Sequence, residues 1–329
     1  MTGAPMPPGA NAVLMVEHAQ ETSPPSESSF ERRIRPEPKR TVVAGENVVP
    51  CGSEARRGEV LIAPGTRLGP EEIALAASCG WTQVRVYQRP QVAVLATGDE
   101  LVEAGAPDGP AEAIPNHRIY DSNSHSLAAL LLQSHAVPLR QPAAPDRREE
   151  LTARIAHAME TAPLLLLTGG VSMGKYDLVE EALAGMGAEF FFTGVKMQPG
   201  KPVVFGRVPA ADDRPERYFF GLPGNPVSTM VTFRVFVEPL LAAMGGQRAW
   251  QPRFALAQLA GEVRVKPGLT RFLPARLDTA RDTPRVTPVP TQGSGDLAAN
   301  ARANCYILVP DGPEAAELAS QRVVRVLLR

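Results

Sequence analysis

The sequence predicts an α/β protein in which a doubly wound domain with a mostly parallel sheet is flanked by β-rich N-terminal segments and a small C-terminal β-module. Two observations lead to this fold class. In the middle of the chain, short continuous apolar runs alternate with helical apolar stripes, as in a parallel sheet that is buried on both faces. Beyond about residue 250, short apolar alternations are interrupted by Pro and Gly, which is typical of a small all-β unit.

The N-terminal region is predicted to have two parts. Residues 1–50 are expected to be the remnant of a β-rich domain, because they contain a short apolar run at residues 12–16 that predicts a strand. Residues 51–90 are expected to form a linking α+β segment. In this segment Pro70, followed by glutamates, predicts the start of a short helix, and the run at residues 84–87 predicts a strand.

Residues 91–246 are predicted to form the doubly wound domain. Strands are expected at the apolar runs 92–96, 163–167 and 190–195. Helices are expected where apolar residues recur at helical spacing, after Asp121, after Asp146 and behind Pro226. Residues 251–329 are predicted to form a β-barrel-like module.

Composition argues against several classes of protein. With 34 Lys and Arg against 35 Asp and Glu, the formal net charge is −1, so nothing attracts nucleic acid or an anionic membrane at long range. The three cysteines lie far apart and show no zinc-ligand spacing, which argues against zinc and disulfides. The chain contains no signal-peptide pattern and no apolar run long enough to span a bilayer. We therefore expect a cytoplasmic protein that binds neither nucleic acid nor membrane.

Glycine-containing loops follow three apolar runs, 92–96, 163–167 and 218–222, at the edge where open α/β sheets bind ligands. These loops are residues 97–100, 168–174 and 223–228. Glycine lets backbone N–H groups approach an anion, and the N-terminus of the next helix adds positive potential. One such loop alone is more often an ordinary tight turn, but three on one edge predict a shared anion-binding floor.

Charged residues beside these loops indicate what they could bind. The adjacent carboxylates of Asp99 and Glu100 could hold a hard cation such as Mg²⁺ against a phosphate, and Asp177 has a similar setting. Each could equally be a solvated acid in a turn, and Asp146 alone fits a helix N-cap better. Lys201 lies in a stiff Pro-Gly-Lys-Pro turn, which either fixes an ammonium for an oxyanion or displays a surface charge. Spacing alone thus indicates an anionic, phosphorylated ligand with a divalent metal and leaves the reaction open.

Six stretches, in order along the chain, resemble one protein family. They are VLATGDELVE (94–103), IYDSN (119–123), TGGVSMGKYD (168–177), MQPGKPVVFG (197–206), GLPGNPVS (221–228) and QGSG (292–295). Together they resemble the MoeA/gephyrin-E-domain molybdopterin molybdenumtransferases, and the resemblance runs from Met1 to the C-terminus. TGDE and TGG loops also occur in related molybdopterin-binding domains, whereas PGKP, LPGNPVS and the trailing QGSG together are specific to this family.

The resemblance implies that residues 91–246 are a molybdopterin-binding domain. It further implies an enzyme that uses Mg²⁺ and molybdate to insert molybdenum into adenylylated molybdopterin, with release of AMP, in molybdenum cofactor biosynthesis. It also implies a homodimer, with the adenylyltransferase of the same pathway as a further partner.

The family's site residues can be carried over to the matching positions of this chain. Those implied to act in catalysis are Thr2 (across a dimer interface), Glu100, Asp146 and Asp177. Those implied to hold the metal are Asp99, Glu100 and Asp177. Those implied to bind pterin or molybdate are Gly98, Gly169, Gly170, Ser172, Lys201, Pro202, Gly224, Asn225, Ser228, Arg271 and Ser294.

The chain departs from the family pattern in three places. Gly52-Ser53-Glu54 stands where the family has Gly-Glu-Asp, and Gln198 stands where a lysine is common. Met1 matches an interior family position, so the upstream reading frame is expected to encode the family's Pro-Phe-Asp and Asp-Gly-Tyr-Ala segment. Two alternatives remain open. A molybdopterin adenylyltransferase would resemble only residues 91–246, and a non-catalytic pterin-binding or scaffold protein would keep the pocket without turnover.

Overall fold

The computed structural model describes residues 3–22, 34–105, 117–170, 178–211, 214–280, 282–312 and 317–329. The chain divides into two compact units, Met1–Pro64 and Gly65–Arg329. The finer domain boundaries expected from the sequence, near residues 50, 90 and 250, remain predictions.

The described part of the first unit, residues 3–22 and 34–64, has little regular structure. Its elements are a 3-10 turn at Val16–His18, β1 (Ala19–Glu21) and β2 (Ile34–Pro36), and the two strands pair antiparallel. The strand predicted at residues 12–16 is wrong. Val13 donates its N–H to the Glu46 carbonyl and accepts a bond from the Asn47 side chain, so its backbone bonds go to a turn instead of a strand ladder.

The second unit begins with the helix α1 (Pro70–Ser78), as predicted. Pro70 occupies the first turn, and the Glu72 carboxylate accepts the Gly69 N–H at 2.8 Å, which caps the helix. The strand predicted at residues 84–87 is wrong, because this segment has no regular structure. The segment pairs with no strand among the described residues, and its apolar side chains are exposed. It therefore has no buried face that would stabilise a strand.

The centre of the second unit is a six-stranded sheet with the order β6-β3-β7-β11-β10-β8. Its strands are β3 (Gln91–Ala96), β6 (Val137–Arg140), β7 (Leu164–Thr168), β8 (Glu189–Phe192), β10 (Val204–Val208) and β11 (Arg217–Leu222). β6, β3, β7 and β11 are parallel neighbours, and β10 is antiparallel to both strands beside it, which confirms a mostly parallel sheet. β8 ends at Phe192 and not at Val195 as predicted, because Val195 bonds to the Lys201 carbonyl.

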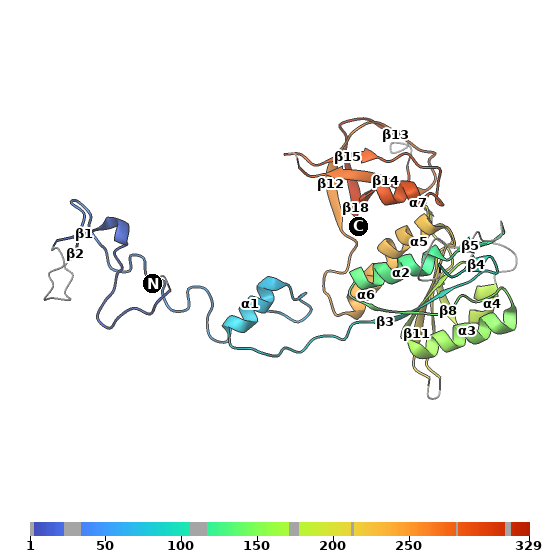
Figure 1. Ribbon diagram of the computed structural model, residues 1–329, viewed down its shortest axis with the longest axis horizontal. Helices are drawn as coiled ribbons and strands as arrows, with labels where there is room; N and C mark the ends of the chain where they lie inside the picture. Colours follow the sequence, from blue (N-terminus) through green and yellow to red (C-terminus); the bar gives the residue numbers. More distant parts are fainter. Residues whose placement is uncertain are drawn as a thin grey trace. The chain divides into compact units, whose positions relative to one another are not determined.

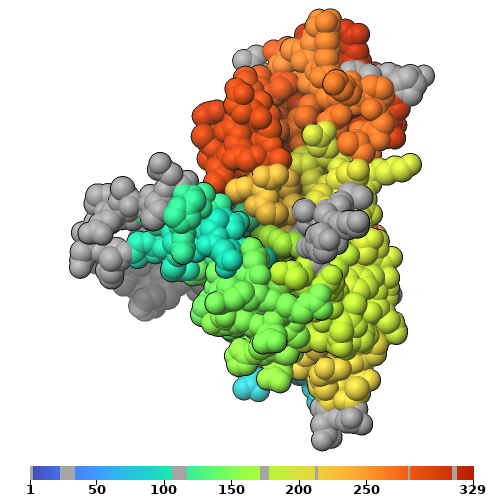
Figure 2. Space-filling model, turned by 90° about the vertical axis from the view of Figure 1, so that its right-hand side faces the viewer, coloured from blue at the N-terminus to red at the C-terminus, as the bar shows by residue number. Residues whose placement is uncertain are grey.

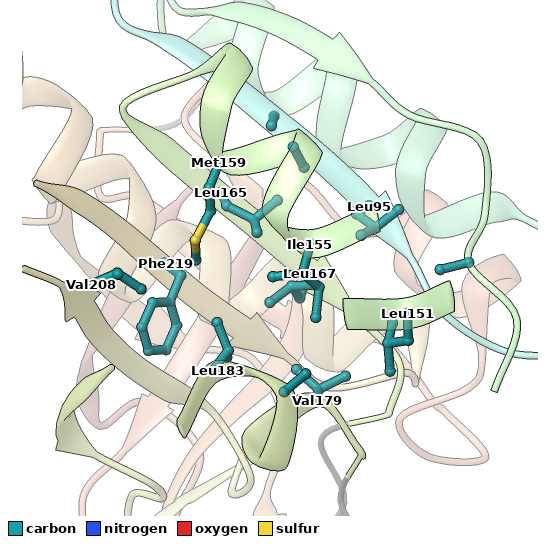
Figure 3. Packing of buried hydrophobic residues seen from close by; sticks show 14 of the residues in the cluster. Leu95, Leu151, Ile155, Met159, Leu165, Leu167, Val179, Leu183, Val208 and Phe219 are labelled. Carbon is teal, nitrogen blue, oxygen red and sulfur yellow. The ribbon is translucent and has the colours of Figure 1, made fainter. Parts of the chain in front are cut away.

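Helices cover both faces of this sheet, as expected for a doubly wound domain (Figure 1). One face carries α2 (Ser122–Gln133), α5 (Pro226–Thr232) and α6 (Glu238–Met244), and the other carries α3 (Arg148–Thr161) and α4 (Leu178–Gly185). Figure 3 shows the apolar face of α3, with Leu151, Ile155 and Met159, packed on sheet residues such as Leu167. Ile155 and Leu167 are fully buried, so α3 is stabilised mainly by removing this face from water.

α5, a π-helical segment at Phe233–Val237 and α6 form one continuous helix, Pro226–Met244. Of the helices that the structure describes, this one alone is long and apolar enough to cross a bilayer, but 56% of its most apolar window is buried inside the protein. Its Arg234 is also buried and pairs with Glu238 at 3.1 Å and with Gln133 at 2.7 Å. The buried, paired arginine and the sheet contacts identify it as a core helix.

The C-terminal module is a closed sheet. Its strands are β12 (Phe254–Leu259), β14 (Thr270–Asp278), β15 (Arg285–Pro288), β16 (Cys305–Val309) and β18 (Val323–Leu328). β15 pairs with both β12 and β14, which closes the order β15-β12-β18-β16-β14 on itself as in a small barrel. The remaining elements are α7 (Leu297–Arg302) and the strand pairs β4 (Leu101–Val102) with β5 (Ile119–Tyr120) and β13 (Val263–Arg264) with β17 (Glu317–Leu318).

A two-residue strand of the α/β domain, β9 (Met197–Gln198), joins the barrel by pairing in parallel with the start of β14. Buried side chains from both parts form one apolar cluster that includes Val231 of α5 and Phe272 and Tyr306 of the barrel. In Figure 2 the orange and red module lies directly on the yellow segments of the α/β domain. The barrel and the α/β domain therefore share part of their core.

Candidate functional site

The candidate site lies at the carboxyl ends of β3 and β7. From β3 the chain moves outward to β6, and it then returns past β3 to form β7. The strand order therefore reverses between β3 and β7, and open α/β sheets bind ligands outside the carboxyl ends of their strands at such a switch point. The loops after β3, β7 and β11 all begin at this edge, because the three strands are parallel neighbours.

The loop after β3 brings two carboxylates together. The Asp146 N–H donates to Asp99 Oδ1 at 3.2 Å, and the Asp99 N–H donates to Asp146 Oδ2 at 3.4 Å. The N-cap interpretation of Asp146 is therefore wrong: the N-cap of α3 is Arg147, whose side chain makes no capping bond. Glu100 follows Asp99, is exposed, and folds its carboxylate back to 2.5 Å from where a Cβ on Gly98 would stand. We call Asp99, Glu100 and Asp146 the acidic corner.

The loop after β7 approaches Thr97 so closely that only glycine fits. Gly169 and Gly170 have φ angles of +87° and +64°, in the left-handed region. A Cβ on Gly169 would lie 2.4 Å from the Thr97 carbonyl oxygen, and one on Gly170 would lie 2.8 Å from the Thr97 hydroxyl. Thr97 is 3% exposed, and its hydroxyl makes no hydrogen bond to any residue that the structure describes. The two predicted glycines thus form a tight floor against the first loop.

A side chain from the start of α2 joins the second loop to the third. Asn123 Nδ2 donates to Thr168 Oγ1 at 2.9 Å and to the Gly224 carbonyl at 2.8 Å. A Cβ on Gly224 would lie 3.6 Å from Gly169 Cα, so the backbones of the two loops run close together. In the sequence, Asn123 is marked only as the last residue of the family stretch IYDSN (119–123). The N-cap is Asp121, and no spacing in the sequence indicates what the Asn123 amide reaches.

The third loop leads into α5, where it meets the C-terminal module. The Val227 N–H donates to the Ser294 carbonyl at 3.1 Å. The predicted positions Asn225, Ser228 and Ser294 therefore lie around the first turn of one helix. Ser228 is 4% exposed, whereas Asn225 is open to solvent.

The Ser294 loop is held in place by Asp296. Its carboxylate accepts the Ala299 N–H at 2.9 Å, which caps α7, and the Gln292 N–H at 3.0 Å. These two bonds favour the charged form, so they hold the pKa of Asp296 below its usual range. The Asp296 carboxylate thus bonds the first residue of the QGSG segment and also caps the helix that follows it.

The loop that carries Lys201 packs on the same helix. Gly200 has a φ of +107°, and a Cβ there would lie 2.4 Å from Thr232 Cγ2 and 3.8 Å from the Ser228 carbonyl. Glycine is required here because the loop backbone touches the second turn of α5. Lys201 itself is exposed and Pro202 is half-buried. The structure thus brings the Lys201 loop to the helix that begins at the third loop.

Arg271 lies on the barrel side of this loop. Its guanidinium donates to the Lys266 carbonyl at 2.9 and 3.2 Å and also to the side-chain carbonyl of Gln198. Because Gln198 directly precedes the Pro-Gly-Lys-Pro turn, Arg271 ties the barrel to that turn. Sequence reasoning missed this contact, since the two residues are 73 positions apart.

Arg140, at the end of β6, fixes the start of α2 beside the site. Its Nη2 lies 2.8 and 2.9 Å from the two carboxylate oxygens of Glu103, and its Nε donates to Ser124 Oγ at 3.0 Å. His125 contacts the same carboxylate at 2.9 Å. The hydrogen bond from Arg140 is the largest cause that lowers the pKa of Glu103.

Three predicted site residues, Thr2, Ser172 and Asp177, lie outside the described residues. Within the described part, no three side chains of His, Cys, Asp or Glu converge as a ready metal site. Asp99 and Asp146 nevertheless supply neighbouring carboxylates, and Mg²⁺ is commonly held by one or two carboxylates together with water and substrate phosphates. The residues present fit this mode of Mg²⁺ binding.

Three family models match successive parts of the chain. The MoeA N-terminal region (domain I and II) matches residues 1–80, and the probable molybdopterin binding domain matches residues 93–243. The MoeA C-terminal region (domain IV) matches residues 257–327. An adenylyltransferase that resembles only the α/β domain does not account for the first and third matches.

Proteins named molybdopterin molybdenumtransferase are similar over most of the chain. The one from Haemophilus influenzae is 32% identical over 317 residues, which are 94% of this chain and 72% of that protein. The one from Bacillus subtilis is 32% identical over 330 residues, which are 100% of this chain and 72% of that protein. A solved MoeA structure from Pyrococcus horikoshii has a TM-score of 0.71 at 26% identity and is matched over 97% of this chain and 72% of that one. The chain therefore belongs to the MoeA family of molybdopterin molybdenumtransferases.

Proposed function

We propose that this protein inserts molybdenum from molybdate into adenylylated molybdopterin and releases AMP, as a step of molybdenum cofactor biosynthesis. One observation carries the proposal. The loops after β3, β7 and β11 meet at the switch point of the sheet, and the Lys201 loop packs on the helix that follows the third of them. Family membership supports the same reaction, since relatives 32% identical to this chain are named molybdopterin molybdenumtransferase.

The acidic corner is the proposed place for the phosphates. Asp99, Glu100 and Asp146 would hold Mg²⁺ together with the phosphate oxygens of the nucleotide, with Asp177 as a further acid. Mg²⁺, when bound, neutralises charge on the phosphate that leaves as part of AMP. The main chain of the second loop would approach the same anion at Gly169 and Gly170, because neither residue has a side chain that blocks it.

The other side of the site is the proposed place for molybdate. Lys201 supplies a cation on a loop whose backbone is fixed against α5, and a fixed cation suits an oxyanion better than a mobile one. Further contacts to molybdate are proposed for Pro202, Ser228 and Ser294. Gly224, Asn225 and Ser172 are proposed to contact the pterin nucleotide instead. Arg271 acts here mainly through Gln198, because its guanidinium is already bonded to that side chain and to the Lys266 carbonyl.

We also propose a homodimer. Large apolar side chains between residues 70 and 87 are exposed in the single chain, with Ile73 at 61%, Trp81 at 66% and Tyr87 at 63%. Several exposed large apolar side chains within one short segment favour a surface that a partner covers. A second copy would also bring Thr2 of the partner subunit to the site, as the family resemblance implies.

Two further proposals concern a partner protein and the location in the cell. The adenylyltransferase of the same pathway would be a transient partner, because it makes the adenylylated pterin that this protein consumes. The protein would work in the cytoplasm, where its cysteines stay reduced.

Release of AMP by the purified protein tests the proposal. With adenylylated molybdopterin, molybdate and Mg²⁺, we expect AMP to form in proportion to molybdenum bound by the pterin. Formation of adenylylated pterin from ATP instead would identify an adenylyltransferase. Pterin binding without AMP release would identify a non-catalytic binding protein. Either result would contradict the proposed reaction.

The Lys201→Ala variant tests the molybdate side separately. Loss of one hydrogen bond to a charged partner costs about 1.5–3 kcal/mol, which corresponds to a roughly 10- to 100-fold rise in the half-saturating molybdate concentration. Lys196→Ala is the matched control, because Lys196 is an exposed lysine just ahead of the same turn. Equal effects of both changes would mean that general positive charge matters and that Lys201 has no fixed role.

A further inference from the structure

The amide of Asn123 contacts two of the three loops that form the candidate site. It lies in the first turn of α2, two positions after the N-cap Asp121. Its Nδ2 donates to Thr168 Oγ1 at 2.9 Å, at the start of the second loop, and to the Gly224 carbonyl at 2.8 Å, in the third loop. Asn123 lies on α2, and its two partners lie at the end of β7 and in the β11–α5 connection. One side chain therefore joins three elements.

Chemistry fixes the orientation of this amide. A carbonyl oxygen can only accept a hydrogen bond, so the group that faces Gly224 must be the Nδ2 donor and not the Oδ1 acceptor. Oδ1 is buried and bonds to no residue that the structure describes. The amide is therefore held by its two donated bonds, and both of them lead to loops of the site.

The same two loops are tied by a second set of bonds, centred on Pro223. The Pro223 carbonyl accepts from Thr168 Oγ1 at 3.4 Å and from Thr229 Oγ1 at 2.5 Å. The Thr168 hydroxyl thus accepts a hydrogen bond from Asn123 and donates one to the carbonyl of Pro223, the residue before Gly224. Asn123, Thr168 and Pro223 form a short polar chain that fixes the spacing between the second and third loops.

The Lys201 loop is held by different contacts. Gly200 packs on Thr232, and Gln198 is bonded to Arg271 of the barrel. Neither contact involves Asn123. A disturbance at Asn123 should therefore move the loops proposed for the pterin nucleotide and leave the molybdate side in place.

We infer that Asn123 is a positioning residue that sets the distance between the Gly169-Gly170 loop and the Gly224-Asn225 loop, and through them the fit of the pterin nucleotide. This inference rests on the proposed function only for the identity of the ligand. The positioning role itself concerns the loops and is testable without turnover.

Asn123→Asp is the sharpest variant. It keeps the shape of the side chain, but it replaces the donor with an acceptor 2.8 Å from the Gly224 carbonyl, so the two oxygens repel. Aspartate is favoured in the first turn of a helix, because it faces the positive end of the helix dipole. The variant should therefore open the loops without weakening α2. Asn123→Ala removes the donor but adds no repulsion, so its effect should be smaller.

Amide hydrogen exchange of the full chain reads out the loops directly. Peptides that contain Gly169-Gly170 and Gly224-Asn225 should exchange at least tenfold faster in Asn123→Asp, less so in Asn123→Ala, and the central strands should be unchanged. Asn304→Asp is the matched control, because the Asn304 amide also donates to a main-chain carbonyl, that of Leu277, within the barrel. It should leave both loops unchanged.

Kinetics with adenylylated molybdopterin then tests the link to the ligand. In Asn123→Asp the half-saturating pterin concentration should rise at least tenfold, while the half-saturating molybdate concentration stays within twofold of that of the unaltered protein. A purely structural role would lower activity through loss of folded protein and would not separate the two substrates.

The outcomes are distinct. Unchanged loop exchange in Asn123→Asp, or faster exchange throughout the sheet, would overturn the positioning role, and so would a larger effect of Asn123→Ala. A parallel loss for both substrates would overturn the link to the pterin side. If the unaltered protein releases no AMP, the proposed function fails, but the exchange experiment still decides the role of Asn123.

Discussion

Replacing Gly169 by alanine should destabilise the second unit by an amount that the local geometry allows us to estimate. The φ angle of +87° lies in the left-handed region, which costs an L-residue roughly 1–2 kcal/mol. The new Cβ would also lie 2.4 Å from the Thr97 carbonyl oxygen, well inside contact distance. Forcing such a contact apart typically costs about 1–3 kcal/mol. We therefore expect the free energy of unfolding to fall by about 2–5 kcal/mol.

Relieving the overlap between the new Cβ and the Thr97 carbonyl oxygen costs free energy, because Thr97 is itself held in place. Its N–H donates to the Thr168 carbonyl at 2.9 Å, and its side chain is buried at the end of β3. Moving the Thr97 carbonyl away from Gly169 would stretch the bond that joins β3 to β7 at the site.

Gly185→Ala is the matched control, because it makes the same chemical change in the same domain with the opposite expected sign. Gly185 is the last residue of α4, is exposed, and has no neighbouring atom within 4 Å of a Cβ. Alanine there should raise the free energy of unfolding by about 0.5–1 kcal/mol, because it reduces the entropy of the unfolded chain and favours the helix.

Urea unfolding of the full chain, followed by circular dichroism, measures both changes as shifts of the transition midpoint at constant slope. The reasoning predicts shifts in opposite directions. It would be refuted if Gly169→Ala lay within about 0.5 kcal/mol of the unaltered protein, the usual range for a surface substitution. It would also be refuted if both variants shifted the midpoint in the same direction.

Three more outcomes are expected. Glu100→Gln should abolish most AMP release across a Mg²⁺ titration while the thermal midpoint stays unchanged, because the side chain is exposed; normal turnover would move the metal role to another acid. A thiol reagent at pH 8 should label Cys51 and Cys79 at once and Cys305 only after unfolding, because burial raises the pKa of the Cys305 thiol to about 11; early labelling of all three would contradict this. The pKa of Asp296 is lowered on folding, so its stabilising effect is present above the ordinary value of 3.8 and is lost as the pH falls through the folded value. The protection factors of amides in the QGSG segment, which are corrected for the intrinsic pH dependence of exchange, should therefore fall below about pH 4, and Asp296→Asn should show the low protection already at pH 7.

Much of the fold follows from patterns that are local in the sequence. The apolar runs near residues 92–96 and 163–167 predicted β3 and β7, because a central parallel strand is buried on both faces and needs apolar residues throughout. The apolar run at residues 12–16 and the alternating run at residues 84–87 also have strand-like patterns but form no strand. A strand needs a neighbour to pair with, and composition alone does not report whether one is present.

The candidate site could be predicted as a set of loops but not as a set of contacts. Glycines after the strands indicated where the backbone approaches something closely, and Gly169 and Gly170 lie too close to Thr97 to carry a side chain, as that reasoning requires. The reciprocal bonds of Asp99 and Asp146 join residues 47 positions apart. No local pattern distinguishes such an exchange from an N-cap, since both use an aspartate just ahead of a helix.

The pairing of β9 with β14 bears on how such proteins could be rebuilt. Met197 and Gln198 belong to the α/β domain by chain order, yet their partner strand lies in the barrel. A barrel exchanged for that of a relative would have to present a compatible edge to these two residues, or the turn that carries Lys201 would lose its support. The barrel therefore cannot be exchanged independently of the α/β domain. Chimeric enzymes should retain activity only when β9 and β14 are taken from the same parent.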